Sequence, residues 1–267
     1  MKRIVTLCTT LLVTVLASGT PASAHQVVLQ QSSGEITVFA AASLIDAFKE
    51  IAAGFQYENP SAMVTYNFGG SNTLRAQLDQ GASADVFASA DQTQMDMARQ
   101  NGDLSGDAQV FAHNLLTIIT PADNPQNVQS PCDLGKPGLK FVAVQPSVPV
   151  GLYTESMLTN ASAGPCGAGF GDQVHANTVS QESDVRQLVA KVQLGEADAG
   201  VSYMTDVTPA VRSQIHELSI PDELNTLATY PIATAKGNNN EGGQAFISFV
   251  LSPIGQAILA RWGFLAA

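Results

Sequence analysis

Basic side chains are scarce in this chain of 267 residues, which has 12 Lys and Arg against 23 Asp and Glu and a formal net charge of −11. This balance excludes nucleic-acid binding as a function class, because such proteins gain affinity by neutralising phosphates with Lys and Arg. It also argues against binding to anionic lipid surfaces. A small anion is not excluded, provided that local dipoles rather than net charge hold it.

Cysteine and histidine are also rare, with three Cys and four His in the whole chain. The histidines are scattered and no Cys/His cluster has the spacing of metal ligands, so we expect no metal site. Cys132 and Cys166 lie beyond the N-terminal leader, and an even pair in an oxidising compartment suggests a disulfide. The sequence does not show whether the two thiols come within bonding distance, so a disulfide and two free thiols stay open as alternatives.

Long hydrophobic runs are missing after the N-terminus. There, two basic residues precede an apolar run over 4–17, and small residues at 22–24 supply a cleavage site. This pattern predicts a signal peptide over 1–24, because the run is too short to span a bilayer. Its removal would lower the net charge to −13. We therefore expect a periplasmic protein, secreted across the inner membrane, with no direct membrane insertion.

The sequence does contain a repeated alternation of short apolar strands and amphipathic helices. The stretch 36–44 begins as a strand and passes through three alanines into Ser43, after which apolar residues recur at helical spacing. Comparable strand and helix patterns follow over 64–98 and again over 141–203. This alternation predicts α/β architecture, with parallel sheets covered by helices on both faces.

Two repetitions of the pattern predict two lobes. We place lobe 1 at 35–117 and 232–267 and lobe 2 at 118–231, with close strand crossings near 115–120 and 229–234 acting as a hinge. The last expected elements are a strand over 175–179 and helices over 245–251 and 253–262.

Four strand-to-helix junctions share small or uncharged residues. They lie at 42–44, 70–72, 149–151 and 184–186. The free N–H groups and the positive end of the helix dipole at such a junction can hold an anion. Ligands of open α/β sheets bind beyond the carboxyl ends of the strands, so a cleft between the lobes would collect all four junctions. A serine there also serves as a helix cap, and the junctions alone leave both roles open.

Several of these motifs, taken together, resemble the extracytoplasmic molybdate-binding proteins of ABC transporters. The resemblance covers nearly all of the mature chain, from Glu35 to Phe264, and implies a type II periplasmic-binding-protein fold whose two doubly wound lobes, joined by a hinge, close on a tetrahedral oxyanion. The motifs that carry it are Val38-Phe39-Ala40-Ala41-Ala42-Ser43-Leu44, Phe68-Gly69-Gly70-Ser71, Ala84-Asp85-Val86-Phe87-Ala88-Ser89-Ala90-Asp91, Val148-Pro149-Val150-Gly151 and Ala199-Gly200-Val201-Ser202-Tyr203.

The resemblance also implies which residues bind the ligand. In the family, serine hydroxyls, main-chain N–H groups and a tyrosine hydroxyl hold the ligand oxygens. Carried over to this chain, the ligand-binding residues are Ser43 and Ser71 through their hydroxyls, Val150 and Val185 through their N–H groups, and Tyr203 through its hydroxyl.

The ligand implied is molybdate or tungstate, with no cofactor and no further metal. The partner implied is the membrane permease of an ABC transporter, and we expect a monomer. Gly69-Gly70 before Ser71 departs from the serine-rich form of the family, and the match at Val185 rests on Asp184-Val185-Arg186 alone.

The physical chemistry of the ligand agrees with this donor set. Molybdate is a dianion near neutral pH and offers only acceptors, so hydroxyl and N–H groups suit it and reject oxyanions that carry a proton. Arg75 and Arg186 lie close by in sequence, and a direct salt bridge to the ligand is the less favoured alternative. Asp85 and Asp91 are interpreted as turn and capping residues.

Two alternatives remain. The first is a binding protein for another oxyanion or a small carboxylate, such as sulfate or phosphate. The second is an enzyme on the same fold, against which the sequence offers no histidine in a motif with Ser43, no conspicuous carboxylate pair and no Gly-x-Ser-x-Gly elbow.

Overall fold

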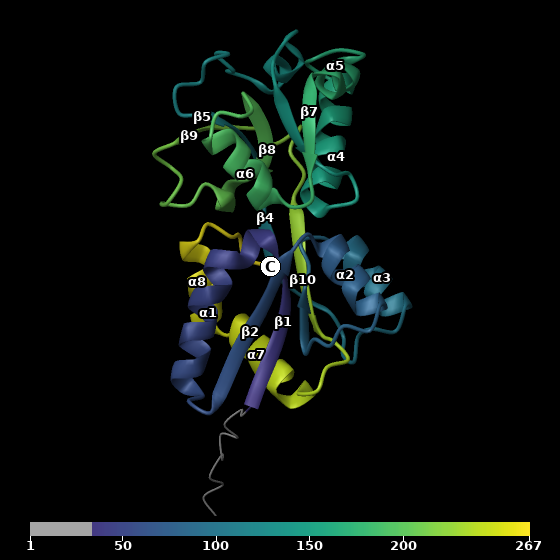
Figure 1. Ribbon diagram of the computed structural model, residues 1–267, viewed down its shortest axis with the longest axis vertical. Coiled ribbons are helices and arrows are strands. Elements are labelled where there is room, and N and C mark those ends of the chain that lie inside the picture. Colours follow the sequence, from purple (N-terminus) through teal and green to yellow (C-terminus); the bar gives the residue numbers. More distant parts are fainter. Residues whose placement is uncertain (1–33) are drawn as a thin grey trace, which may run out of the picture. The chain divides into compact units, whose positions relative to one another are not determined.

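The structure is a computed structural model that describes residues 34–267 (Figure 1). The predicted signal peptide over 1–24 lies outside the described residues. The described part of the chain contains ten β-strands in two five-stranded sheets, together with eight α-helices. The expectation of an α/β fold is confirmed.

The first sheet has the strand order β2-β1-β3-β10-β4. Its first three strands are parallel, whereas β10 runs antiparallel to both β3 and β4. Strand β1 lies inside the sheet and is buried from Ile36 to Ala41 except for the partly exposed Thr37, as expected of a parallel strand with helices on both faces. The strands are β1 (Gly34–Ala41), β2 (Ala62–Gly69), β3 (Val86–Ala88), β4 (Gln109–Asn114) and β10 (Ala228–Thr234).

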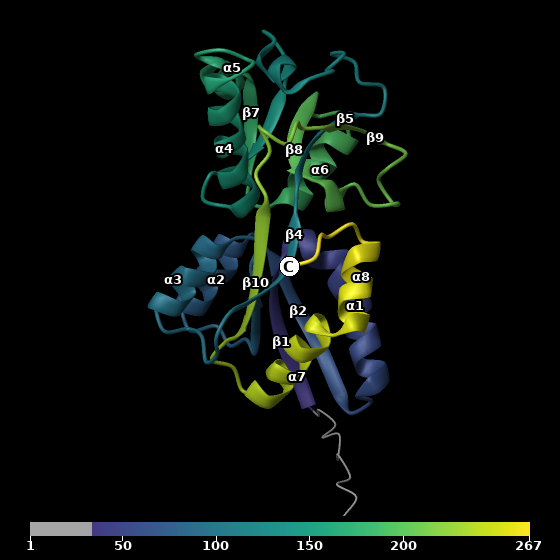
Figure 2. The same ribbon diagram turned by 180° about the vertical axis from the view of Figure 1, so that it is seen from behind.

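Helices cover both faces of this sheet (Figures 1 and 2). Three phenylalanines pack together in the core. The ring of Phe246 makes edge-on contacts with those of Phe48 and Phe55, at centroid distances of 6.0 and 5.5 Å. The helices are α2 (Ser71–Asp79) and α3 (Gln92–Gln100) on one face, and α1 (Ile45–Glu58), α7 (Asn240–Leu251) and α8 (Pro253–Arg261) on the other.

The second sheet repeats the arrangement, with the order β7-β6-β8-β5-β9. Strand β6 is parallel to β7 and β8, and β5 is antiparallel to β8 and β9. In Figure 1, α4 and α5 lie on one side of this sheet and α6 on the other. The elements are β5 (Leu116–Pro121), β6 (Phe141–Val144), α4 (Pro149–Ala163), α5 (Phe170–Asn177), β7 (Thr178–Glu182), α6 (Val185–Gln193), β8 (Ala199–Tyr203) and β9 (Ile215–Ser219).

A disulfide joins Cys132 to Cys166, with the two Cα atoms 5.1 Å apart. Cys132 lies in a short 3-10 helix (Pro131–Gly135) before β6, and Cys166 lies in the loop between α4 and α5. Of the two alternatives left open by the sequence, the structure therefore has the bridge.

The chain passes between the sheets twice. It leaves the first sheet at the end of β4 and enters β5 after a single residue, Leu115. It returns over the segment between β9 and β10, so the strand at 228–234 belongs to the first sheet throughout. The predicted lobe limits, 35–117 with 232–267 and 118–231, stay a prediction.

Three elements were not expected. Strands β4 and β9 lie at the edges of their sheets, and their mixed polar sequences give no clean alternation. The expectation of a strand over 175–179 was wrong for its first part, because residues 175–177 form the last turn of α5 and β7 begins at Thr178. Helix α5 follows Gly169, whose φ of 81° a glycine adopts without strain.

Among the described residues, no single helix has the length and apolar character needed to cross a membrane. Within residues 34–267, only α7 and α8 taken together meet that test, and a bend of 63° separates them.

Candidate functional site

A small cavity lies at the ends of strands from both sheets. All five residues implied by the resemblance are on its wall, so the structure brings together side chains from four separate junctions and from the end of β8. Whether they bind a ligand stays a prediction. The lining residues are Ala41, Ala42, Ser43, Gly69, Gly70, Ser71, Ala90, Val148, Pro149, Val150, Asp184, Val185 and Tyr203.

The first sheet supplies two buried hydroxyls. Ser43 lies in the 3-10 turn (Ala42–Leu44) that follows β1, and its Oγ is 3.0 Å from the hydroxyl of Tyr230. Ser71 is the first residue of α2, and its Oγ accepts a hydrogen bond of 3.0 Å from the N–H of Ala90. Because that N–H can only donate, the proton of the Ser71 hydroxyl is free for the cavity.

The second sheet supplies main-chain donors at the starts of α4 and α6. The first N–H groups of a helix have no partner inside it. Asp184 caps α6 by accepting from the N–H groups of Arg186 and Gln187, at 2.9 and 3.1 Å, which leaves the N–H of Val185 unused. Within residues 34–267, neither this N–H nor that of Val150 has a hydrogen-bond partner. Both residues line the cavity.

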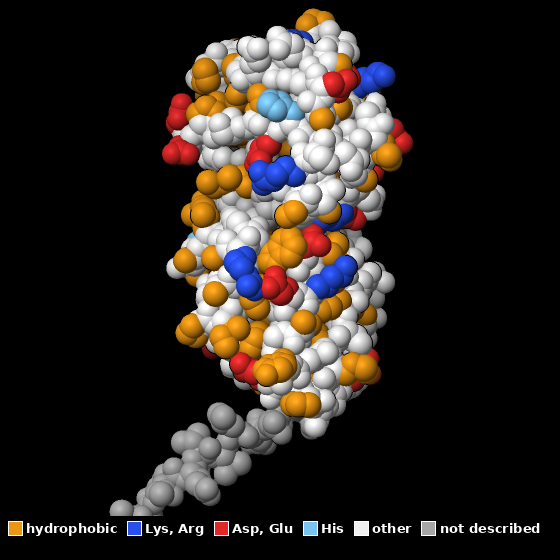
Figure 3. All heavy atoms as spheres, turned by 90° about the vertical axis from the view of Figure 1, so that its left-hand side faces the viewer, with side chains coloured by type: hydrophobic (Ala, Val, Ile, Leu, Met, Phe, Trp, Pro, Cys, Tyr) orange, Lys and Arg blue, Asp and Glu red, His pale blue; other side chains and the backbone are white. Residues whose placement is uncertain are grey.

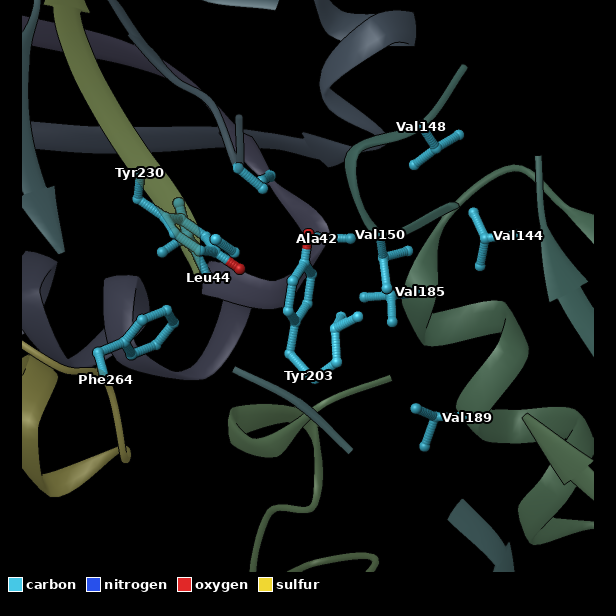
Figure 4. Close-up of a cluster of buried hydrophobic side chains, with 14 of the residues drawn as sticks. Ala42, Leu44, Val144, Val148, Val150, Val185, Val189, Tyr203, Tyr230 and Phe264 are labelled. Atoms are coloured by element: carbon cyan, nitrogen blue, oxygen red, sulfur yellow. The ribbon is translucent and has the colours of Figure 1, made fainter. Parts of the chain in front are cut away.

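Tyr203 adds a third hydroxyl from the end of β8. The residue is 1% exposed, and its hydroxyl has no partner among the described residues. Figure 4 shows this hydroxyl directed toward Ala42 and Val150. Burial raises the pKa of Tyr203 well above its ordinary value of 10, so the group stays a neutral donor at physiological pH.

The arginines near these junctions do not line the cavity. Arg75 donates to Gln94 at 2.9 Å and pairs with Asp79. Figure 3 likewise shows Lys and Arg side chains dispersed over one face, several beside Asp or Glu, rather than gathered in a basic patch there.

Arg186 instead links the elements around the cavity. Its Nη2 lies 2.8 Å from a carboxylate oxygen of Asp46 in α1, and its Nε donates to the carbonyl of Ala42 at 3.3 Å. The same Nε is 3.3 Å from the fully buried carboxylate of Asp206. Burial raises the pKa of Asp206, and the Arg186 charge and the hydrogen bonds from Ser202 and the Tyr203 N–H oppose that rise.

Asp85 and Asp91 have the structural roles that were interpreted from the sequence. Asp91 caps α3 by accepting from the N–H of Gln94 at 2.7 Å. Asp85 accepts from the N–H groups of Thr37 and Asn239, at 2.8 and 2.6 Å. No group of three or more His, Cys, Asp or Glu suited to a metal occurs among the described residues.

Sequence reasoning missed three contributors to the site. The sequence predicts a strand at Tyr230, and no local signal connects this residue to Ser43, which is 187 positions away. The Ala90 N–H, which holds Ser71, lies in a motif that was recognised without this role. Gly70 was noted as a departure from the family, but its close approach to the second sheet was not expected: a Cβ there would lie 2.6 Å from the carbonyl oxygen of Ser183.

The wall is thus dominated by neutral donors and small apolar groups, a set suited to a ligand that offers only acceptors. Two mixed sheets of parallel and antiparallel strands, covered by helices and with such a cavity at their strand ends, are the architecture of a two-lobed solute-binding protein. The chain belongs to the bacterial extracellular solute-binding protein family, whose profile matches residues 36–265.

Relatives with assigned roles extend this result. The chain is 38% identical over 235 residues to the molybdate-binding protein ModA of Mycobacterium tuberculosis, covering 88% of this chain and 85% of that protein. It is 31% identical to ModA of Escherichia coli, covering 86% and 89%. A sulfate-binding protein of Synechococcus elongatus is 24% identical, covering 89% of this chain and 76% of the relative.

Solved structures agree with the fold. The substrate-binding domain of a putative molybdenum ABC transporter from Clostridium difficile superposes with a TM-score of 0.64 and 29% identity, covering 87% of this chain and 99% of that one. The periplasmic molybdate-binding protein of Azotobacter vinelandii gives a TM-score of 0.76 at 20% identity, with coverages of 87% and 99%.

Proposed function

We propose that this protein captures molybdate, and tungstate equally well, in the cavity between its two sheets and delivers it to an ABC transporter. The names of the relatives support the ligand class, because five proteins at 29–38% identity are described as molybdate-binding. The chemistry of the cavity supports it independently, since an oxyanion without protons needs donors only.

The observation that carries the proposal is the convergence of five donors. Three hydroxyls (Ser43, Ser71 and Tyr203) and two main-chain N–H groups (Val150 and Val185) reach one cavity from both sheets. Three of these donors are buried without a partner among the described residues, a state that costs free energy until a ligand accepts from them. Tungstate has nearly the same size and charge as molybdate, so this site would not distinguish the two.

The remaining parts of the proposal concern place and partners. A signal peptide over 1–24 would direct the protein across the inner membrane into the periplasm. There it would act as a monomer that meets the membrane permease in its closed, loaded form. It would bind without turnover, because the one described partner of the Ser43 hydroxyl is a tyrosine rather than a general base.

Calorimetry on the mature protein tests the proposal with molybdate, tungstate, sulfate and phosphate. We expect tight, similar binding of the first two and much weaker binding of the others. Ser43→Ala should lower molybdate affinity about 10-fold or more, as for a lost hydrogen bond to a charged group. Ser248→Ala is the matched control, because this exposed serine of α7 bonds only within its own helix. Tight sulfate binding with silent molybdate would assign the protein to the other oxyanion.

A further inference from the structure

Tyr230 is fully buried in β10 and does not line the cavity. Its hydroxyl nevertheless contacts Ser43, a residue of the cavity wall. It lies 3.0 Å from the Oγ of Ser43 and 3.3 Å from the Nδ2 of Asn114. Figure 4 shows the ring of Tyr230 beside the 3-10 turn of Ala42 and Leu44. The contact between two hydroxyls has no fixed direction by itself, because either oxygen can donate.

A main-chain group fixes that direction. The N–H of Leu115 donates to the Oδ1 of Asn114 at 3.0 Å. Since a peptide N–H can only donate, the amide atom of Asn114 that faces the Leu115 N–H must be the oxygen, and the other amide atom is the NH₂ nitrogen. The NH₂ group then donates to Thr205 Oγ1 at 2.8 Å and to the hydroxyl oxygen of Tyr230 at 3.3 Å.

The direction of the Asn114 hydrogen bond determines the direction of the next one, between Tyr230 and Ser43. The Tyr230 oxygen accepts from Asn114, so its own proton needs an acceptor, and among the described residues the one within reach is Ser43 Oγ. An unpaired buried O–H would be costly. Ser43 therefore accepts from Tyr230, and its own proton is left for the cavity.

We propose that Tyr230, oriented by Asn114, is a positioning and specificity-determining residue that holds the Ser43 hydroxyl as a donor toward the ligand. The proposal rests on the proposed function and adds to it how protonated oxyanions are rejected. A serine free to rotate can turn a lone pair toward a ligand O–H. Accepting from Tyr230 uses one of the two lone pairs of Ser43 and leaves its proton directed at the cavity, which disfavours such an acceptor contact. Ser71 is held in the same sense by the N–H of Ala90. Burial also raises the pKa of Tyr230, which keeps its donating proton in place.

Tyr230→Phe tests the proposal, because it removes the hydroxyl and keeps the ring packed against Tyr203 and Phe264. Tyr66→Phe is the control: its hydroxyl donates to the Phe48 carbonyl at 2.6 Å, outside the cavity wall. Molybdate, sulfate and hydrogen phosphate are titrated into both variants and the parent at about pH 8. Sulfate and hydrogen phosphate are matched in size and charge there but differ by one proton.

We expect Tyr230→Phe to weaken molybdate about three- to tenfold, the effect of losing one neutral hydrogen bond. In the same variant, hydrogen phosphate should gain on sulfate by about threefold or more, measured directly or by competition with molybdate. A structural loosening would weaken both anions alike and leave that ratio unchanged.

Asn114→Asp supplies an independent arm that keeps the acceptor for Leu115 but presents an acceptor to Tyr230. The Tyr230 proton would turn away from Ser43, and molybdate affinity should fall more than in Tyr230→Phe.

An unchanged phosphate-to-sulfate ratio in Tyr230→Phe, or unchanged molybdate affinity, overturns the inference, and so does a phosphate signal too weak to detect in every protein. Failure of the parent protein to bind any oxyanion would instead overturn the proposed function. Melting temperatures of all variants separate these outcomes from loss of folding.

Discussion

The two halves of the cavity offer the same kind of donor in different states. On the side of the first sheet, the hydroxyls of Ser43 and Ser71 each hold a hydrogen bond to a neighbour, Tyr230 and the Ala90 N–H respectively. On the side of the second sheet, the Tyr203 hydroxyl and the N–H groups of Val150 and Val185 have no partner among the described residues.

This difference indicates which half of the cavity would contribute more free energy to ligand binding. In the proposed site, the serines would be oriented before a ligand arrives, so they would lose little rotational freedom on binding. The second-sheet donors are buried and unsatisfied, and leaving such a group unpaired costs about 1–3 kcal/mol. An anion that accepts from them removes this cost, so the second half should favour the loaded, closed state more strongly than the first.

The largest expected effect comes from separating the halves. Gly70, on the first side, approaches Ser183 and Val148 of the second so closely that an added Cβ would lie 2.6 Å from a main-chain carbonyl oxygen. Gly70→Val should therefore hold the halves apart and weaken molybdate by more than about 100-fold, since a main-chain atom cannot rotate away. Calorimetry measures the loss.

Gly81→Ala is unsuitable as its control, because Gly81 has a φ of 88° and any side chain there is strained. Gly171→Ala is suitable, as this residue of α5 does not line the cavity and a Cβ there would meet the side chains of Ser162 and Leu158, at 3.6 and 3.9 Å. If Gly70→Val binds molybdate as tightly as the Gly171 variant, contact between the halves at Gly70 does not limit closure.

The second effect concerns Arg186, which joins the halves by pairing with Asp46 on one side and Asp206 on the other. Arg186→Met keeps most of the apolar stem and leaves the buried Asp206 without its cation. We expect the free energy of unfolding to fall by about 2–4 kcal/mol near neutral pH, because breaking a buried pair strands a charge. Chemical denaturation measures this change.

The pH dependence of that variant identifies the cause. Burial already raises the folded-state pKa of Asp206, and losing the arginine raises it further. A carboxyl with a raised folded-state pKa favours folding at low pH and loses that contribution as pH rises through the folded-state value. The deficit of Arg186→Met should therefore shrink as the pH is lowered toward about 4. A deficit independent of pH would mean that the lost packing of the arginine stem matters and the stranded charge does not.

Much of this arrangement could be predicted from the sequence, because the determinants are local. The apolar run 36–40, the three alanines and Ser43 specify a strand followed by a helix start, and the structure has both. The Asp184 cap of α6 likewise follows from residue type and position. All four junctions proved to line one cavity, as the topology of open α/β sheets leads one to expect.

The parts that were missed depend on distant contacts. The Asn114–Tyr230–Ser43 network joins residues from three strands or turns, and nothing near any of them in sequence indicates the other two. Edge strand β9 was missed for a related reason, because its partly exposed, polar pattern acquires meaning only through pairing with β5. The disulfide was left open since bonding distance is a property of the fold.

Tyr203 and Ser71 allow the comparison of the halves to be tested directly. Tyr203→Phe removes a hydroxyl that has no partner, so the free protein should keep or slightly raise its melting temperature, while molybdate affinity falls by about 1.5–3 kcal/mol. Ser71→Ala strands the Ala90 N–H, so it should lower both the melting temperature and the affinity. Calorimetry and thermal melts of both variants measure these effects. Equal melting temperatures would contradict the difference between the halves.

The smallest expected effect is that of pH on binding by the parent protein. Burial raises the pKa of Tyr203 well above 10, so ionisation of this cavity-facing phenol should not weaken molybdate binding between about pH 7 and 9. Affinity should change by less than about threefold over that range, as calorimetry at constant ionic strength can show. The raised pKa also affects the free energy of unfolding. Because the folded chain keeps the phenol protonated, the contribution of this group to stability is fully present below about pH 10 and is lost as the pH rises further. A steep fall in affinity near pH 7 would instead require a titrating group in contact with the ligand, and the neutral donors from both halves would then not be sufficient to explain binding.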